Sequence, residues 1–560
     1  MKKKIFIIGT PEEFEFVQSN FSREYKVYAS NFSTYYKYKS QGVIYLYDEI
    51  FLPNNSDKIL DFLSIQWYRD KNDIDLFYED NFSVAPLITR ALVSAFANDY
   101  RNYYAISKFK KNIDCIYISK NCEGSLKRVI EVLNFKVEYY NYSKKAEKLI
   151  SGSPERTKIN PINLKKIIIG NFLFILDTLF SRRKKRKNLV FNDWTYREAF
   201  LKKEDFLLSN DKVFHKGFYV PYGLNFFNKR RGAFFNNPLS LENFTKKISG
   251  LGYGWNDSLS RLFFKCLEET FISSIETILI LKKSYRKVLD FYKPKKIILP
   301  GETYYEYLIV AQLASKVGIE KILLLDGYQT VAENTLFYKD YKNKNMFFDR
   351  YCAFSEANKQ LLEKYHHIEA ENIIEVMSSL AVKSSNFDSQ CKKEYDAIIL
   401  APMPYQIYPN SGFDKRHSIG IELAKKLLDL GLKKIAIKIK PGVNQKKEES
   451  IYNYLIKEYG MEKNVFIISG KLSKFFHSAD FFITQFSSAL FELIINNQKF
   501  ILFEHHDSGL PLDSINSCSF IDPIEIVTDI KKISLSSIIN PKEALKLINI
   551  YENKIENIKF

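Results

Sequence analysis

Residues 481–492 read Phe481-Phe-Ile-Thr-Gln-Phe-Ser-Ser-Ala-Leu-Phe-Glu492. The mostly apolar run Phe481–Thr484 predicts a buried parallel strand, and the segment Ala489–Ile495 predicts a helix. We expect Ser487 or Ser488 to cap this helix, with a hydroxyl that accepts from backbone N–H groups. A helix N-terminus at the carboxyl end of a parallel strand is also where α/β proteins hold phosphate, because unpaired N–H groups and the helix dipole favour an anion. An ordinary N-cap would use the same residues.

The alternation of short apolar runs and helical segments continues on both sides of this stretch. One more strand is expected after it, at Lys499–Phe503. The residues before it predict strands at Asp396–Ala401, Ile435–Ile439 and Val465–Ile468, and helices at Gly420–Leu430 and Glu448–Tyr459. Strands and helices that alternate with short connections are typical of a doubly wound parallel sheet.

A second group of α/β units occupies the N-terminal and central parts of the chain. Lys4–Ile8 predicts a strand, followed by a helix with Thr10 as its cap and Pro11 at its first position. Further strands are expected at Gly42–Tyr47, Asp114–Ile118, Lys136–Tyr140, Lys295–Pro300, Lys321–Leu325 and Asn372–Val376, and helices at Glu123–Leu133, Tyr304–Val317 and Ser355–Tyr365. The predicted fold class is therefore α/β, with two Rossmann-like, doubly wound parallel-sheet domains that face a cleft. Residues 189–285 give no clear assignment.

Length and composition suggest where the domains meet. A chain of 560 residues needs more than one core, since single cores stop growing near ~250–300 residues. Ser151–Pro154 has the composition of a linker, and the polar stretch Lys383–Lys393 that of a hinge. The predicted parts are an N-terminal α/β region at 1–150, a linker with a basic segment at 151–190, the remainder of the first domain at 191–390, and a C-terminal Rossmann-like domain at 391–560.

The formal net charge of +18 is concentrated in part in residues 162–188. The apolar run Ile167–Phe180 contains Asn171 and Asp177, and it is too short and too polar to span a bilayer, which needs about 20 residues. It suits an interfacial helix on an anionic membrane surface, although a buried core helix followed by a solvated basic loop would also fit. The flanking cations are Lys165, Lys166, Arg182, Arg183, Lys184, Lys185, Arg186 and Lys187.

The remaining composition bears on compartment and partners. The six cysteines have no CxxC spacing, so we expect neither a zinc site nor a disulfide framework, and a reducing cytoplasm is the expected compartment. The apolar run Ile5–Ile8 is short and is soon followed by Glu12 and Glu13, so no signal peptide is expected. Nucleic acid is not an expected partner, because the chain lacks the signature motifs of nucleic-acid-binding domains. The expected location is the inner face of the cytoplasmic membrane, where the protein would be peripheral.

Four expected strand ends carry polar residues, and strand ends are where open parallel sheets place their chemistry. Two of them supply acids, and the other two supply cations and hydroxyls. This polarity suits transfer from a phosphate-bearing donor to a hydroxyl, with a carboxylate that takes the proton and a lysine that stabilises the leaving phosphate. An Asp-Gly turn, an acid at a helix start and solvated lysines at a strand edge are the plainer interpretations. The four sites are Gly301-Glu302, Asp326-Gly327, Lys438-Ile439-Lys440-Pro441 and Ser487-Ser488.

With these motifs the chain resembles GT-B glycosyltransferases of bacterial surface polysaccharides, especially those that use CMP-activated sialic acid or Kdo. The bacterial sialyltransferases of this group carry an acidic-acidic-Gly motif, a Lys-x-His-Pro motif and a Ser-Ser motif, in this order. The counterparts here, within residues 295–510, are Leu325-Asp326-Gly327, Lys438-Ile439-Lys440-Pro441 and Ser487-Ser488. Leu325 stands where the group has its first acid, and Lys440 stands where it has His.

The resemblance implies an inverting, metal-independent glycosyltransferase with a C-terminal donor domain and an acceptor side in the first 390 residues. Its donor would be a CMP-linked nonulosonic or Kdo-like acid, its acceptor a capsule- or lipopolysaccharide-type glycan or lipid-linked glycan, and it would need no other cofactor. Asp326 would be the general base, with Glu302 as the second candidate. Lys438, Lys440, Pro441, Ser487 and Ser488 would bind the donor phosphate, and His505 would hold the donor sugar or base.

Two other functions fit the same residues. CDP-glycerol-type phosphotransferases of teichoic acid synthesis share the Ser-Ser-Ala-Leu-Phe-Glu pattern of residues 487–492, which makes a polyol-phosphate transferase the second hypothesis. The third hypothesis is a non-catalytic, membrane-associated assembly subunit, which Leu325 and Lys440 at the positions of an acid and a His would favour.

Overall fold

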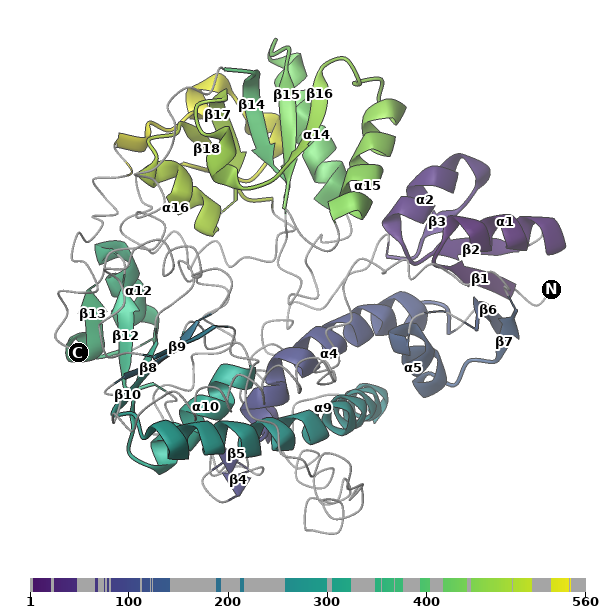
Figure 1. Ribbon diagram of the computed structural model, residues 1–560. Helices are drawn as coiled ribbons and strands as arrows, with labels where there is room; N and C mark the ends of the chain where they lie inside the picture. The colour runs from purple at the N-terminus through teal and green to yellow at the C-terminus, as the bar shows by residue number, and fades with distance from the viewer. Residues whose placement is uncertain are drawn as a thin grey trace.

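Three sheets of parallel strands organise the chain in the computed structural model (Figure 1). The α/β class expected from the sequence is thereby confirmed. The structure describes residues 4–21, 25–47, 66–68, 75, 78–79, 82–110, 113–120, 122, 124–141, 188–192, 212–215, 257–299, 305–323, 348–353, 355–366, 368–375, 393–402, 416–440, 445–485, 487–505, 525–542 and 544.

The N-terminal sheet has the strand order β3-β2-β1-β6-β7, so the chain changes direction between β1 and β6. Phe6 and Ile8 of β1 pack with α1 (Pro11–Asn20) on one face, while Ile5 and Ile7 pack with α4 (Ala85–Ser107) and α5 (Gly124–Val132) on the other. This alternation is the period of two that a strand imposes. The helix α2 (Phe32–Tyr38) and the single turn η1 (Lys39–Gln41) follow β2. The strands are β1 (Lys4–Ile8), β2 (Lys26–Ala29), β3 (Ile44–Tyr45), β6 (Cys115–Ser119) and β7 (Val137–Tyr140).

The middle sheet has the order β13-β12-β11-β10-β8-β9, and the chain changes direction between β8 and β10. Its helices are α10 (Tyr305–Lys316) and α12 (Glu356–His366), with a short turn η6 (Ala370–Asn372). Its strands are β8 (Asn188–Asn192), β9 (Lys212–His215), β10 (Lys296–Leu299), β11 (Glu320–Leu323), β12 (Arg350–Ala353) and β13 (Ile373–Glu375).

The C-terminal sheet has the order β16-β15-β14-β17-β18-β19. Its central strands are buried on both faces, as parallel strands between helices must be. The helices α14 (Arg416–Asp429) and α15 (Gln445–Glu458) cover one face, and α16 (Ser488–Ile495) packs on the other. The strands are β14 (Tyr395–Leu400), β15 (Ile435–Ile439), β16 (Val465–Ser469), β17 (Ala479–Thr484), β18 (Phe500–Phe503) and β19 (Ile526–Val527), and the short turns are η8 (Leu472–Phe475), η10 (Ile530–Lys532) and η11 (Leu535–Ser537).

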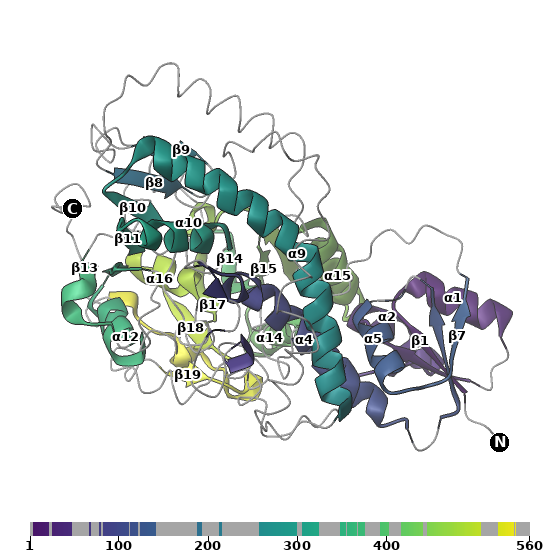
Figure 2. The ribbon, with the colours of Figure 1, turned by 90° about the horizontal axis from the view of Figure 1, so that it is seen from below.

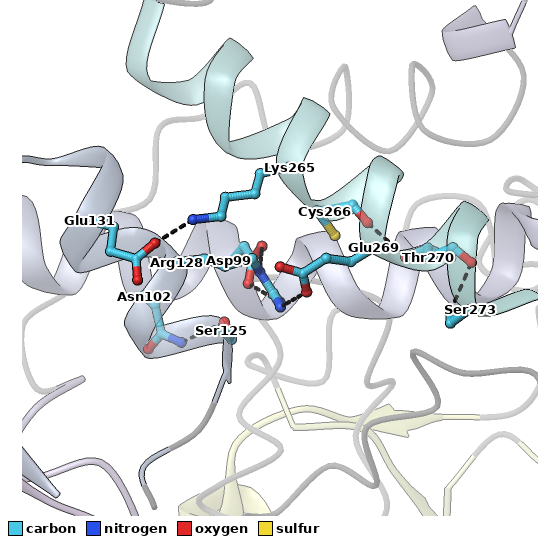
Figure 3. Close-up of polar contacts among 10 residues, drawn as sticks. All are labelled: Asp99, Asn102, Ser125, Arg128, Glu131, Lys265, Cys266, Glu269, Thr270 and Ser273. Atoms are coloured by element: carbon cyan, nitrogen blue, oxygen red, sulfur yellow. Dashed lines mark hydrogen bonds and ion pairs between the residues drawn. The ribbon is translucent and has the colours of Figure 1, made fainter. Parts of the chain in front are cut away.

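One long helix, α9 (Asp257–Tyr292), joins the N-terminal and middle units (Figure 2). It packs along α4 and α10, and its N-terminal half also meets α5. Arg128 of α5 bonds to Asp99 of α4 through Nε (2.9 Å) and Nη2 (2.8 Å), and to Glu269 of α9 through Nη1 (2.7 Å; Figure 3). The short elements η2 (Gln66–Tyr68), β4 (Tyr78–Glu79) and β5 (Phe82–Ser83) precede α4, and Gln312 of α10 pairs with the backbone of Ser83.

Most of the elements expected from the sequence are present, with ends shifted by a few residues. Thr10 caps α1 with Pro11 in the first turn, as predicted, and Ile435–Ile439 forms a strand with the expected bounds. The helix expected from Gly420 begins four residues earlier, at Arg416. The largest difference concerns residues 189–285, which lacked an assignment and which contain most of β8, all of β9 and most of α9.

Two expectations about domains and membrane contact remain to be compared with the structure. Strands from the first 150 residues and strands from 188–375 were expected in one domain, and they form two separate sheets; the domain boundaries stay predictions. The basic segment 162–187 lies outside the described residues, so its contact with a membrane also stays a prediction. Within the described ranges, no helix combines the length and the apolar character needed to cross a bilayer.

Candidate functional site

The C-terminal sheet has a crevice position defined by its topology. Numbering its strands 1 to 6 in chain order gives the order 3-2-1-4-5-6, which is that of a Rossmann fold. The chain changes direction between β14 and β17, and open α/β sheets bind ligands outside the carboxyl ends of the strands at such a point. Ser487 follows β17 directly in this region, three residues after Thr484.

The N-cap position of α16 is occupied by Ser487, as the sequence predicted. Its backbone is extended (φ −152°, ψ 173°), but its side chain makes no capping hydrogen bond. The expectation that this hydroxyl accepts from the helix is therefore wrong for Ser487. Thr10, in the same position on α1, accepts from Glu13 N at 3.2 Å, and the Glu13 carboxylate returns to the N–H of Gly9 at 2.6 Å. The start of α1 is closed by its own side chains, while Ser487 leaves the start of α16 without this closure.

Lys438 lies in β15, the strand next to the edge strand β16, one residue before its end. Only 8% of this residue is exposed, and its ammonium makes no hydrogen bond or ion pair with any residue that the structure describes. Burial lowers the pKa of Lys438, the charge of Glu492 opposes this effect, and the charge of Lys440 adds to it. A largely buried lysine with no direct counter-ion among the described residues is unfavourable. This side chain is therefore suited to an anion that enters the crevice.

A buried charged cluster at the same sheet edge was not found in the sequence. Arg416 Nη2 donates to Glu448 Oε1 at 2.7 Å, and His417 Nε2 lies 2.6 Å from Glu448 Oε2. Burial alone would raise the pKa of Glu448, but the hydrogen bond from His417 and the charges of His417 and Arg416 outweigh it and lower this pKa to about 2. The ring of Tyr452 packs edge-on against His417 at 5.0 Å, and Gly420 makes room for its hydroxyl.

This cluster joins the first turns of α14 and α15, which both begin at the carboxyl edge of the sheet. An amphipathic pattern was visible from Gly420 onward, but Arg416 and His417 precede it. The local sequence around Arg416 and His417 therefore gave no sign of this cluster, because their partner Glu448 is 31 residues further along the chain than His417.

The segment after β18 carries a second set of polar residues. His505 is half-buried and its ring lies 6.2 Å from that of Phe503. Glu504 is fully buried, and its Oε2 accepts from Gln485 Nε2 at 3.3 Å, which links the ends of β17 and β18. The structure thus places His505 at the expected edge, and it adds Glu504, whose burial the sequence did not indicate.

Several predicted site residues lie outside the described residues. These are Glu302, Asp326 and Pro441, and for Ser488 only the backbone position, at the start of α16, is described. Lys440 is described, directly after β15, and is exposed. The predicted donor-binding residues that are described therefore lie at one edge of the C-terminal sheet. The roles of the two candidate bases stay predictions. Among the described residues, no three His, Cys, Asp or Glu side chains form a group that could hold a metal ion.

Comparisons with known proteins gave matches in structure and none in sequence. No protein-family model matches the chain, and no curated protein matches its sequence. A glycosyltransferase from Rickettsia africae is similar in structure with 12% identity and a TM-score of 0.31, over 51% of this chain and 83% of that one. UDP-GlcNAc 2-epimerase from Neisseria meningitidis is similar with 12% identity and a TM-score of 0.36, over 65% and 95%. The wall teichoic acid polymerase TagF is similar with 12% identity and a TM-score of 0.29, over 69% and 85%. Likeness of this size concerns the fold alone, so the function has to be argued from the site.

Proposed function

We propose that this protein is an inverting GT-B glycosyltransferase that moves a sugar from a CMP-activated donor to a hydroxyl of a surface glycan. The observation that carries the proposal is the presence of two features, an uncapped helix start and a lysine, near the carboxyl ends of the strands where the sheet changes direction. The start of α16 lacks a side-chain cap at Ser487, and the buried ammonium of Lys438 lies on the same face of the sheet. Both features favour a phosphate.

The reaction follows from these groups in a simple order. Asp326 takes the proton of the acceptor hydroxyl while the oxygen of this hydroxyl attacks the anomeric carbon of the donor sugar. The bond between this carbon and the phosphate oxygen breaks, and CMP leaves with the electron pair. Lys438 and the N-terminus of α16 stabilise the charge that develops on the phosphate. The choice of CMP, and of a nonulosonic or Kdo-like acid as the sugar, is supported by the resemblance of residues 438–441 and 487–488 to sialyltransferase motifs.

A pair of helix-cap variants tests the site. Ser487→Ala removes a hydroxyl that makes no intramolecular cap, so we expect little loss of stability but a fall in nucleotide affinity of roughly tenfold or more, as for a hydrogen bond to a charged group. Thr10→Ala removes a hydroxyl that does cap its helix, and it should cost about 1 kcal/mol of stability without changing nucleotide affinity.

The measurement is calorimetric titration and thermal shift with CMP, CDP, UDP, GDP and ADP on the wild type and both variants. Binding of CMP that weakens only in Ser487→Ala supports the proposed donor and its place. Equal nucleotide binding by the wild type and Ser487→Ala would mean that the start of α16 has only a structural role. Preference for UDP or GDP would overturn the CMP donor, and a polyol-phosphate transferase would instead show itself by release of CMP from a CDP-linked donor.

A further inference from the structure

The helix α2 of the N-terminal unit lies beside the end of α15, which belongs to the C-terminal unit of β14–β19 and their helices (Figures 1 and 2). Lys39, in the turn that follows α2, places its Nζ 3.9 Å from Oε1 of Glu458, the last residue of α15. Tyr35 of α2 packs against the apolar cluster under α14 and α15, and also against the cluster between α1 and the N-terminal sheet. Burial and the charge of Glu458 raise the pKa of Tyr454 on α15, and the charge of Lys37 on α2 opposes them. An ion pair and an aromatic side chain therefore join two units that are far apart in the sequence.

Each of these two helices is fixed firmly within its own unit. Thr34 of α2 donates from Oγ1 to the carbonyl of Gly9 at 3.1 Å, and the hydroxyl of Tyr38 donates to Glu15 Oε1 at 2.8 Å. The first turn of α15 is tied to α14 by the buried charged cluster around Glu448. If the two units separate, we therefore expect them to part between α2 and α15, with each helix staying on its own sheet.

The N-terminal unit is joined much more strongly to the middle unit, through α9. Arg128 is largely buried and hydrogen-bonded, and Phe96 of α4 meets Phe263 of α9 edge to face with ring centroids 5.2 Å apart. Lys39 and Glu458, by contrast, keep 41% and 33% of their side chains exposed. An exposed ion pair contributes little because water already solvates its charges, whereas a broken buried pair is costly. The contact between α2 and α15 is therefore the weaker of the two joints.

We propose that the contact between α2 and α15 is a latch: the N-terminal and middle units move as one body, which closes on the C-terminal unit and opens from it at the ion pair of Lys39 and Glu458. In the closed state α15 is held at both ends, by α14 at its first turn and by α2 at its last. In the open state the tie to α2 is lost, while the cluster around Glu448 stays intact. Because neither state requires a nucleotide, the inference does not rest on the proposed function.

Coupling with a water-soluble carbodiimide tests whether the contact forms in solution. The reagent joins a lysine amine to a carboxylate that it touches, and peptide mass spectrometry identifies the joined residues. Lys37 and Glu15 are the matched reference, because their Nζ and Oε1 also lie 3.9 Å apart but both belong to the N-terminal unit. We expect both products in the fraction that runs as a single chain. The reference product without a product between Lys39 and Glu458 would overturn the inference.

Charge reversal tests whether the contact can open. Lys39→Glu and Glu458→Lys each place like charges together, which should raise the ratio of open to closed molecules roughly tenfold and so increase the radius of gyration in X-ray scattering. The double variant restores an ion pair, and its radius should return to that of the wild type.

Lys136→Glu is the control for these variants, because it places a like charge beside Glu138, 3.7 Å from the original ammonium and within the N-terminal unit. It should leave the radius of gyration unchanged. If the product between Lys39 and Glu458 forms but neither reversal changes the radius, the two units are held together rigidly and the inference is wrong.

Discussion

Two candidate acids follow neighbouring strands of the middle sheet at the same spacing in the sequence. Glu302 comes three residues after Leu299, where β10 ends, and Asp326 comes three residues after Leu323, where β11 ends. The strand β10 borders the point where this sheet changes direction, and β11 is one strand further away. Strand order therefore leads us to expect Glu302 rather than Asp326 as the base, while the motif resemblance favours Asp326.

Turnover of the two conservative variants separates these candidates. Asp326→Asn should reduce turnover by the ~10²–10⁴-fold typical of a lost general base, with nucleotide affinity kept. Glu302→Gln should then retain most of the activity. Near-normal turnover in Asp326→Asn together with a large loss in Glu302→Gln would transfer the role of base to Glu302. A sugar-transfer assay with saturating donor measures both.

For single residues, the sequence predicted the place in a helix or strand better than the burial and hydrogen bonding of the side chain. It placed Ser487 at the start of a helix, because the apolar run before it and the helix-forming residues after it are its neighbours in the sequence. It could not show that the hydroxyl of Ser487 leaves its helix uncapped, nor that Lys438 is buried. The burial of Lys438 depends on β14 and β16, which pair on either side of β15. These pairings join distant segments of the chain, and the local Ile-Lys-Ile-Lys pattern would fit an exposed edge strand equally well.

Among the elements, α14 and α15 are tied at their first turns by a charged cluster. Glu448 has a pKa of about 2 in the folded protein, below its ordinary value of 4.5. A lowered pKa means that the folded state favours the ionised form, so the stabilisation is complete above pH 4.5 and is lost as the pH falls toward 2. Since one pKa unit corresponds to ~1.4 kcal/mol, the amount is on the order of 3 kcal/mol.

Glu448→Gln should lower the free energy of unfolding at pH 7 and should remove part of its decline between pH 4.5 and 2. Urea denaturation at several pH values measures both effects. Glu462→Gln is the control, because Glu462 is an exposed acid of the same unit, and its decline with acid should match that of the wild type. A Glu448→Gln variant with an unchanged acid profile would show that the cluster contributes nothing to stability.

The helix α9 shows why one large element was missed. Its buried positions recur every three or four residues, but Thr270, Ser274 and Ser284 interrupt the apolar stripe. Two of these hydroxyls are satisfied, because Thr270 and Ser284 donate to the carbonyls of Cys266 and Ile280 in the preceding turn, while the buried hydroxyl of Ser274 makes no hydrogen bond with the described residues. The apolar pattern is therefore interrupted in the middle of this helix, so hydrophobic periodicity alone does not predict its full length.

On the scale of the whole molecule, the described residues hold the N-terminal sheet to the middle unit by helix packing and by a largely buried charge network. Its α4 and α5 dock on α9, and α9 continues to α10 of the middle unit. Individual sheets could be predicted from consecutive strand–helix units. That the first 150 residues would form a sheet of their own could not, because strand pairing between distant segments leaves no mark in the local pattern.

The network of Arg128, Asp99 and Glu269 (Figure 3) lets this docking be tested. Asp99 is fully buried, so Arg128→Ala leaves an unpaired buried carboxylate and should cost about 3–5 kcal/mol. Because the loss falls on one unit, we expect scanning calorimetry to show an early transition for the N-terminal unit, separate from the rest.

Removal of both charges in Asp99→Asn, Arg128→Met should recover much of that loss, since a buried ion pair is often no better than an uncharged pair of similar size. Lys265→Ala breaks only the more exposed contact with Glu131, and it should leave the thermogram as in the wild type. A single transition at the wild-type temperature in Arg128→Ala would mean that apolar packing of α4 and α5 on α9 holds the units together without the charges. In that case the network would serve only to satisfy its own buried groups.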